Sequence, residues 1–319
     1  MNKQHVRSGH MQAKYMEGDI KLLAKKKELG RSHLTGWIML LPALIYLLVW
    51  NVYPLVYALY VSFSNLNLTR INAAKFIGFT NYTVLLKDKT FYTAVGNTLL
   101  LTVSTIAIEL IIGYFIAKLF TAADGVKGTG ILRTLFMIPI MVTPLIIGLL
   151  WSYILNPTLG VMNYILDLLH LPTLAWFGDP KVALYSILGI NVWQWAPFMM
   201  LLIIAGLNSI PKDLTEVAQI EGAGFWSRLK NIEAPFIWHV VVLGIFIRVM
   251  ESLKMFDVVY VTTNGGPGTA TELMSLMAYR QSFLYYQTGS GAAVAIIILI
   301  ISTVIVQMLF KYLWKRDVV

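Results

Sequence analysis

Six long apolar runs, separated by shorter polar segments, set the pattern of this chain. The first covers residues 36–63 and contains no charged side chain. A helix needs about 20 apolar residues to cross the hydrocarbon core of a membrane, and this run exceeds that length. The others cover residues 91–119, 134–155, 182–207, 235–261 and 291–314. The pattern predicts an all-α integral membrane protein with six transmembrane helices.

Two of these runs contain residues that should bend the helices or join them to each other. Pro139 and Pro144 lie in the first half of the third run. We expect them to kink that helix beside a cavity and to free backbone carbonyls that then need partners inside the protein. Glu109 interrupts the second run, and a carboxylate inside a membrane helix is usually paired with another residue. We therefore expect Glu109 to make a buried contact between helices.

The composition agrees with a membrane protein and argues against a nucleic-acid partner. The chain is 57% hydrophobic and 13% charged, whereas soluble domains are roughly 45–50% apolar and about 25% charged. The net charge is +9, but most Lys and Arg residues lie at the ends of the apolar runs. Charge placed in this way usually sets the orientation in the membrane. We expect the chain to be surrounded by membrane lipid and to bind no nucleic acid.

The distribution of basic residues predicts the orientation. Most of the 25 Lys and Arg residues fall in the N-terminal segment, the loops 118–133 and 208–235, and the C-terminal tail. Basic loops stay on the cytoplasmic side of a membrane. Both termini and the loop 208–235 are therefore expected in the cytoplasm, with the chain spanning the inner (cytoplasmic) membrane several times.

The chain divides into a basic N-terminal extension, residues 1–33, and a membrane domain, residues 34–319. The extension contains Ile20, Leu22 and Leu23 beside a run of lysines. It could form an amphipathic helix on an anionic lipid surface, or it could be an unstructured positive anchor. Both interpretations are open at this point.

No motif for catalysis is visible. The segment from Gly125 to Gly130 is rich in glycine but lacks the Lys-Ser/Thr pair that completes a phosphate-binding loop. The chain has no Cys, and its five His residues show no metal-ligand spacing. We predict a protein that is not an enzyme and that binds no metal or cofactor of its own, so any pumping must be driven by another protein.

A polar segment between the fourth and fifth runs forms the clearest candidate site. Between Pro211 and Pro235 the pattern predicts a helix, a turn at Gly222, and a second helix. Val217 and Ile220 give the first helix a narrow apolar face flanked by acidic residues. Such a helix can dock in a groove of another protein, or it can lie in the lipid interface.

The same segment resembles a known signature. Glu216-x-Ala218-x3-Gly222-Ala223-x8-Ile232-x-x-Pro235 resembles the "EAA" motif of binding-protein-dependent ABC importer permeases, with Val217 and Ala234 as departures. Further stretches resemble the carbohydrate permeases of that family, to which the larger membrane subunit of the maltose transporter belongs. They are Phe76-Ile-Gly-Phe-Thr-Asn-Tyr82, Leu155-Asn-Pro-Thr-Leu-Gly160, Trp193-Gln-Trp-Ala-Pro197 and Asn264-Gly-Gly-Pro-Gly268 followed by Thr271-Glu272.

The resemblance implies a type I permease fold and a set of partners. These are a second, homologous permease, two cytoplasmic ATP-binding subunits that hold ATP and Mg, and an extracytoplasmic sugar-binding protein. The polar hairpin would be the coupling helix that enters a cleft of the ATP-binding subunit. The residues that the resemblance assigns to this coupling are Glu216, Val217, Ala218, Ile220, Gly222 and Ala223. Glu216 would contact the ATP-binding subunit, Ala218 and Ala223 would allow close packing, and Gly222 would shape the turn.

The resemblance also places a substrate pathway in the fourth and fifth runs. Its candidate residues are Gln194, Trp195, Phe198, Arg248, Glu251, Ser252 and Met255. Arg248 could grip the carboxylate of an acidic sugar such as a uronide or alginate-type oligosaccharide, since guanidinium binds carboxylates through two parallel hydrogen bonds. Arg248 and Glu251 share a helix face, so an internal pair between them is equally open.

Two mechanisms can be distinguished for such a chain. The favoured one is the permease subunit of an ATP-driven importer of a sugar or oligosaccharide. The alternative is a stand-alone secondary transporter or channel, but no inverted repeat or ion-coupling site is apparent in the sequence.

Overall fold

The computed structural model describes residues 37–123 and 125–313, so the basic extension 1–33 lies outside the described residues. Within these ranges every regular element is a helix, apart from one isolated bridge between Ser64 and Phe76. The chain separates into two compact units, residues 1–60 and 61–319, which we describe in turn.

The described part of the first unit is one apolar helix. It belongs to the span Trp37–Ser62 and includes a π-helical turn, η1 (Leu48–Val52), before α2 (Tyr53–Ser62). Side chains such as Trp37, Trp50 and Tyr53 are exposed. A helix that is apolar all round is unstable in water but suited to a lipid environment. This agrees with the predicted first span.

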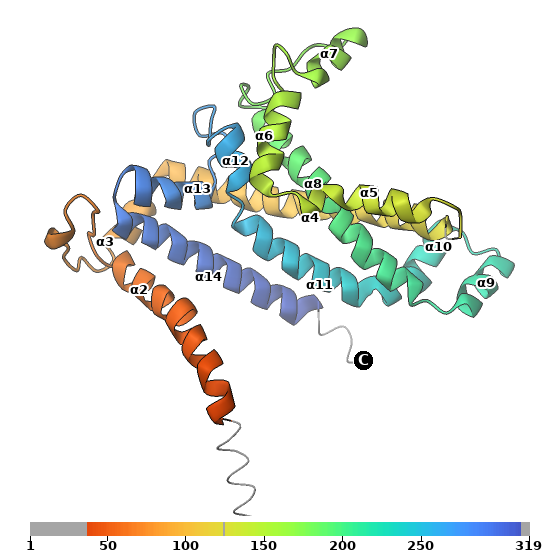
Figure 1. The fold of residues 1–319 in the computed structure, drawn as a ribbon, viewed down its shortest axis with the longest axis horizontal. Coiled ribbons are helices and arrows are strands. Elements are labelled where there is room, and N and C mark those ends of the chain that lie inside the picture. The colour runs from red at the N-terminus through yellow and green to blue at the C-terminus, as the bar shows by residue number, and fades with distance from the viewer. Residues whose placement is uncertain (1–36, 124, 314–319) are drawn as a thin grey trace, which may run out of the picture. The chain divides into compact units, whose positions relative to one another are not determined.

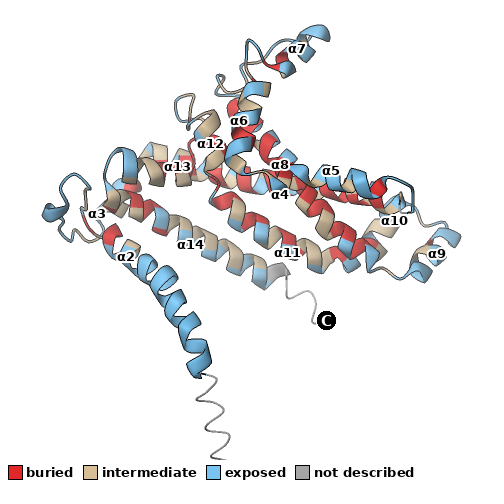
Figure 2. Ribbon diagram, in the orientation of Figure 1, coloured by how far each residue is buried: buried red, intermediate tan, exposed pale blue. Residues whose placement is uncertain are grey.

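The second unit is built on four long helices. They are α4 (Lys89–Ala122), α8 (Ala183–Asn208), α11 (Ala234–Leu253) and α14 (Thr288–Leu313). α8 packs on α4 and α11, and α11 also contacts α14, so these helices lie side by side (Figure 1). Buried residues follow the facing sides of α4, α8 and α11, whereas outward-facing residues are exposed (Figure 2). The polar hairpin leaves this bundle at one end, and α13 lies at the other (Figure 1).

Glycines let the long helices approach closely. A Cβ atom on Gly113 of α4 would lie 2.8 Å from the Cβ of Met199 on α8. The same distance separates a Cβ on Gly206 of α8 from a methyl group of Val240 on α11. Small residues at helix crossings are a common device for packing inside a membrane, where no hydrophobic effect draws helices together.

The third predicted span is broken. α5 (Thr129–Met141) and α6 (Pro144–Ile154) meet at an angle of 99°. Pro144 occupies the first turn of α6, where its missing N–H is tolerated. The expected kink is confirmed, but it is a sharp break between two helices at Val142 and Thr143. α6 and the short α7 (Val161–Leu168) project away from the bundle (Figure 1).

The described residues thus contain five helices of spanning length, or six when the broken pair counts as one span. The fifth predicted span is also interrupted, because α11 ends at Leu253 and α12 (Asp257–Thr262) restarts after a short turn. The remaining short elements are η2 (Ile71–Ala73), α3 (Thr80–Leu85), α13 (Met274–Tyr279) and η4 (Arg280–Leu284).

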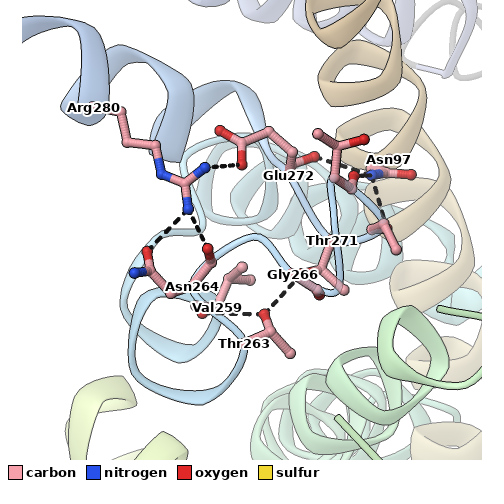
Figure 3. A network of polar contacts seen from close by, with 10 residues as sticks. Asn97, Val259, Thr263, Asn264, Gly266, Thr271, Glu272 and Arg280 are labelled. Atoms are coloured by element: carbon pink, nitrogen blue, oxygen red, sulfur yellow. Dashed lines mark hydrogen bonds and ion pairs between the residues drawn. The ribbon is translucent and has the colours of Figure 1, made fainter. Parts of the chain in front are cut away.

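A polar network orders the loop that follows α12. Figure 3 shows Arg280 donating to the Glu272 carboxylate over 2.7 Å and to Asn264. Asn97 of α4 donates to the carbonyls of Ala270 and Glu272, at 3.0 Å each. Burial raises the pKa of the Glu272 carboxyl, and the positive charge of Arg280 opposes that rise. The Asn-Gly-Gly-Pro-Gly motif and the Thr-Glu pair of the sequence are therefore parts of one ordered turn.

Candidate functional site

The polar hairpin consists of α9 (Lys212–Ile220), α10 (Phe225–Arg228) and the π-helical turn η3 (Leu229–Glu233). α9 ends in a left-handed cap. Ala223 N–H donates to the Ala218 carbonyl over 2.9 Å, and Gly222 N–H donates to the Gln219 carbonyl over 3.1 Å. Gly222 has φ +70°, a conformation that side chains with a Cβ rarely adopt. The glycine of the motif is therefore required by the backbone of the turn.

α9 presents an apolar stripe to its surroundings. Val217 is 51% exposed and Ile220 is 85% exposed, with Leu214 on the preceding turn at 44%. These residues recur every three positions, so they lie on one side of the helix. Glu216 is exposed beside them. An apolar stripe exposed on a short polar helix is suited to a groove on another protein.

The two small residues of the motif differ from the stripe. Ala218 is only 5% exposed, and Ala223 is half-buried. Ala218 is thus packed against other residues of this chain. A larger side chain at this position would disturb the hairpin itself.

A second candidate site is a polar pocket of about 290 Å³ within the bundle. It lies where the broken third span, α8, α11 and the turn before α12 converge. The residues that line it are Pro144, Asn191, Gln194, Trp195, Arg248, Glu251, Lys254, Met255, Phe256, Asp257 and Val258. Five of the seven residues predicted for the substrate pathway are in this set, namely Gln194, Trp195, Arg248, Glu251 and Met255.

Arg248 is buried and paired at one side of this pocket. Its side chain is 1% exposed, and Glu109 of α4 is 0% exposed. Nε and Nη2 donate to the two carboxylate oxygens of Glu109, each over 2.7 Å. Nη2 also donates to Asn191 Oδ1 over 2.8 Å, and the guanidinium carbon lies 4.3 Å from the centre of the Trp195 ring. This is a two-point ion pair with an aromatic cover, in a place where an unpaired charge would be very costly.

Arg248 does not pair with Glu251, which was one of the two alternatives left open by the sequence. Glu251 pairs with Lys254 over 2.9 Å, and both side chains of that pair are partly exposed. Arg248 lies on the buried side of α11, where α4 supplies a carboxylate, while the Glu251 side chain is partly exposed. The prediction that Glu109 makes a buried contact between helices is confirmed.

Gln194 joins the pocket to the break in the third span. Its Nε2 donates to the carbonyl of Val142 over 3.1 Å, which is the kind of carbonyl partner that the prolines were expected to require. Its Oε1 is buried and has no hydrogen-bond partner among the described residues. The hydroxyl of Ser252, which is 3% exposed, has none among them either. Buried polar atoms without partners are unusual in native structures.

The remaining predicted pathway residues lie beside the pocket. Phe198 packs edge-on against Trp195 with 6.1 Å between ring centres. Asn191, Phe256 and Asp257 line the pocket although the candidate set omitted them. The amide of Asn191 lies one helical turn before Trp195, so helical spacing could have identified it. Phe256 and Asp257 lie beyond the end of α11, in the turn before α12 and at its first residue, and the apolar pattern did not predict this interruption.

A larger cavity of about 870 Å³ lies between α4, α5 and α8, and its lining is apolar. Trp193 is part of this cavity and packs against Trp151, with 5.4 Å between ring centres. Trp193 therefore lines the apolar cavity, whereas Trp195 lines the polar pocket. Among the described residues, no group of three or more His, Asp or Glu side chains could hold a metal ion.

Together these features describe a chain with several apolar helices of spanning length, a polar internal pocket and a short helix with an exposed apolar stripe. The family model for the "Binding-protein-dependent transport system inner membrane component" matches residues 109–316. The chain belongs to this family.

Two relatives illustrate the similarity of this chain to known permeases. It is 34% identical to the trehalose/maltose transport system permease protein MalF of Thermococcus litoralis, over 86% of this chain and 92% of that protein. It is 31% identical to the sulfoquinovosyl glycerol transport system permease protein SmoG of Agrobacterium fabrum, over 90% of this chain and 92% of that protein.

The fold is shared with a solved transporter. A chain in the crystal structure of a bacterial alginate ABC transporter, in complex with its alginate pentasaccharide-bound periplasmic protein, superimposes with a TM-score of 0.76. The sequences are 22% identical, and the match covers 89% of this chain and 95% of that one. The predicted all-helical permease fold is confirmed.

Proposed function

We propose that this chain is the membrane-spanning permease subunit of an ATP-driven importer that takes up a sugar or oligosaccharide. The observation that carries the proposal is the arrangement of α11. This helix begins directly after the exposed hairpin and carries Arg248 and Glu251 of the polar pocket. A partner that moves the hairpin therefore acts on the same helix that lines the pocket.

The proposed partners follow from the family and from the exposed stripe of α9. Two cytoplasmic ATP-binding subunits bind and hydrolyse ATP with Mg, and one of them receives Val217 and Ile220 in a cleft. A second, homologous permease completes the pathway, and an extracytoplasmic binding protein delivers the sugar. In this arrangement the chain has no ATPase activity of its own. Both termini face the cytoplasm, as the basic loops predict.

The mechanism is a shift between two conformations. When the ATP-binding subunits close on ATP, they hold the hairpin in a new position. The closed state thereby stabilises one orientation of the transmembrane helices over the other, since a ligand shifts an equilibrium only through its different affinity for the two states. The polar pocket opens alternately to the two sides of the membrane, and the basic side with its hairpin stays in the cytoplasm.

The pocket favours recognition of hydroxyl groups. Gln194, which lines the pocket, has a buried Oε1 without a partner among the described residues, and a sugar hydroxyl can donate to it. Trp195 offers an aromatic surface for the C–H face of a pyranose ring. Trehalose and maltose, in the name of one relative, present such groups.

The ion pair between Arg248 and Glu109 argues against the binding of an acidic sugar at Arg248. The charge of Arg248 is already neutralised through two hydrogen bonds to Glu109, and drawing the guanidinium away to a substrate carboxylate would leave Glu109 buried and unpaired. An acidic sugar is the second candidate substrate, and Lys254 is the cation that supports it. Lys254 lines the pocket, and its side chain is 64% exposed. The cationic group for a uronide is therefore Lys254 in preference to Arg248.

Affinity purification tests the permease assignment. A tagged chain, expressed in its native host, should bring down an ATP-binding subunit and a second permease. A chain that purifies alone, yet transports sugar in vesicles, would contradict the assignment and support a stand-alone transporter.

Substrate tests on the reconstituted complex separate the two cargo candidates. We expect Trp195→Phe to raise the KM for sugar uptake, while Trp193→Phe, in the apolar cavity, leaves the KM unchanged. Lys254→Gln should impair uptake of a uronide oligosaccharide only if the acidic candidate is correct. Equal KM values for the two tryptophan variants would show that the polar pocket does not bind the sugar.

A further inference from the structure

Glu233 is a buried carboxylate at the junction between the hairpin and α11. It is the last residue of η3, and it is 6% exposed. Both of its carboxylate oxygens are bound by side chains of α4. The Tyr114 hydroxyl donates to Oε2 over 2.5 Å, and Lys118 Nζ contacts Oε1 over 2.5 Å. A charged group in such a place must be paired, and both of its partners come from another helix.

Aromatic packing joins the hairpin to the same part of α4. The ring of Phe225, at the start of α10, stacks on Phe115 with 6.3 Å between centres and 6° between planes. It also meets the edge of Tyr114 at 6.4 Å. The second arm of the hairpin is thus held to α4 by a polar contact at one end and an aromatic contact at the other.

α4 also reaches the polar pocket. Glu109, which pairs with Arg248, lies five residues before Tyr114 on the same helix, or about 7.5 Å along its axis. The two polar contacts thus join α4 to the hairpin at Glu233 and to the pocket at Arg248. Over that distance an α-helix is stiff, so a displacement at Tyr114 is carried to Glu109.

We propose that Glu233, held by Tyr114 and Lys118, is the positioning residue through which movement of the hairpin is passed to α4 and hence to the pocket. α11 alone is a poorer connection for this purpose. It is joined to α10 through the π-helical turn η3, and π turns are irregular segments inside helices. Tyr114 of α4 contacts Phe225, which precedes that turn, and Glu233, which ends it, so α4 holds both ends of the turn from outside. This role rests on the proposed function of the chain as a coupled permease.

The test is the ratio of sugar transported to ATP hydrolysed in the complete complex, reconstituted in vesicles with its binding protein. We expect Glu233→Gln and Tyr114→Phe each to lower this ratio by about fivefold or more, a change typical of a lost coupling interaction. The subunits should still assemble, and ATP hydrolysis should continue without uptake. A residue that only stabilises the fold would lower the amount of active complex and leave the ratio unchanged.

Lys230→Gln is the matched control. Lys230 is an exposed charged residue in the same π-helical turn, and its neutralisation should leave the ratio as in the unaltered complex. The reversed pair, Lys118→Glu with Glu233→Lys, should recover part of the lost ratio because it restores an ion pair between the same positions.

Two results would overturn the inference. One is an unchanged ratio in Glu233→Gln and Tyr114→Phe. The other is failure of both variants to assemble, which would show that the contact serves folding alone. If the unaltered chain captures no ATP-binding subunit, the proposed function fails instead, and that outcome is seen before any variant is made.

Discussion

The hairpin around Gly222 is formed by one continuous stretch of chain, whereas the polar pocket is assembled from α6, α8, α11 and the turn that follows α11. The hairpin depends on a local backbone requirement, a left-handed cap at one glycine. The pocket depends on contacts between residues far apart in the sequence, above all Arg248 with Glu109. A change at the hairpin should therefore affect coupling with little effect on the fold, while a change at the pocket's buried pair should affect the whole bundle.

The largest effect is expected at the buried ion pair. Glu109→Gln removes the charge that neutralises Arg248, and breaking such a pair costs about 3–5 kcal/mol because one charge stays buried alone. We expect a large fall in the thermal stability of the purified chain in detergent, measured by size-exclusion chromatography after heating.

Glu251→Gln is the comparison for that measurement. Its partner Lys254 is on the same helix and both side chains are partly exposed, so the loss should be below about 1 kcal/mol. Equal losses of stability in the two variants would show that burial does not distinguish the pairs.

The next effect concerns the packing that brings α4 to α8. Gly113→Ala places a Cβ 2.8 Å from that of Met199, and overpacking of this kind costs about 1–3 kcal/mol. Gly96→Ala, on the same helix with no atom within 4 Å of the new Cβ, should be neutral or slightly stabilising. The same heating assay measures both variants, and a destabilised Gly96→Ala would contradict the close-approach explanation.

A smaller effect is expected at the hairpin. Gly222→Ala puts a side chain at φ +70°, which costs about 1–2 kcal/mol. That free energy corresponds to roughly a 5–30-fold change in the equilibrium constant for forming the hairpin conformation that the partner binds. We expect capture of the ATP-binding subunit to weaken by a factor in this range, while the heating profile of the chain alone changes little.

Gly224→Ala provides the control for that capture assay. Gly224 has φ −67° and no atom within 4 Å of an added Cβ, so capture should be unchanged. If both glycine variants weaken capture equally, the left-handed cap is not the feature that the partner requires.

The same contrast decides how much could be predicted from the sequence. The spans, the break near Pro139 and Pro144, and the turn at Gly222 are local features, and each leaves a mark in nearby residues. The break of the fifth span at Lys254 is less visible, because the apolar pattern continues into α12.

The partner of Arg248 could not be predicted for a different reason. Helical spacing pointed to Glu251, three residues away, but the pair that forms joins positions 139 residues apart. Glu109 was recognised as a residue that needs a partner, and Arg248 as a residue that binds substrate or pairs with Glu251. Only the packing of α4 against α11 brings the two together. The same holds for Glu233, whose partners Tyr114 and Lys118 lie on α4.

The most direct test of the central claim uses the absence of native cysteine from the chain. A single Ile220→Cys substitution places a unique thiol on the exposed stripe of α9, and Leu159→Cys places one at a residue that is 90% exposed near α7. Cross-linking is then measured in membranes that contain the whole complex. The hairpin thiol should cross-link to an ATP-binding subunit, with a yield that changes when ATP is added, and the Leu159→Cys thiol should not. No cross-link from the hairpin, or an equal one from Leu159→Cys, would contradict the assignment of α9 as the coupling element.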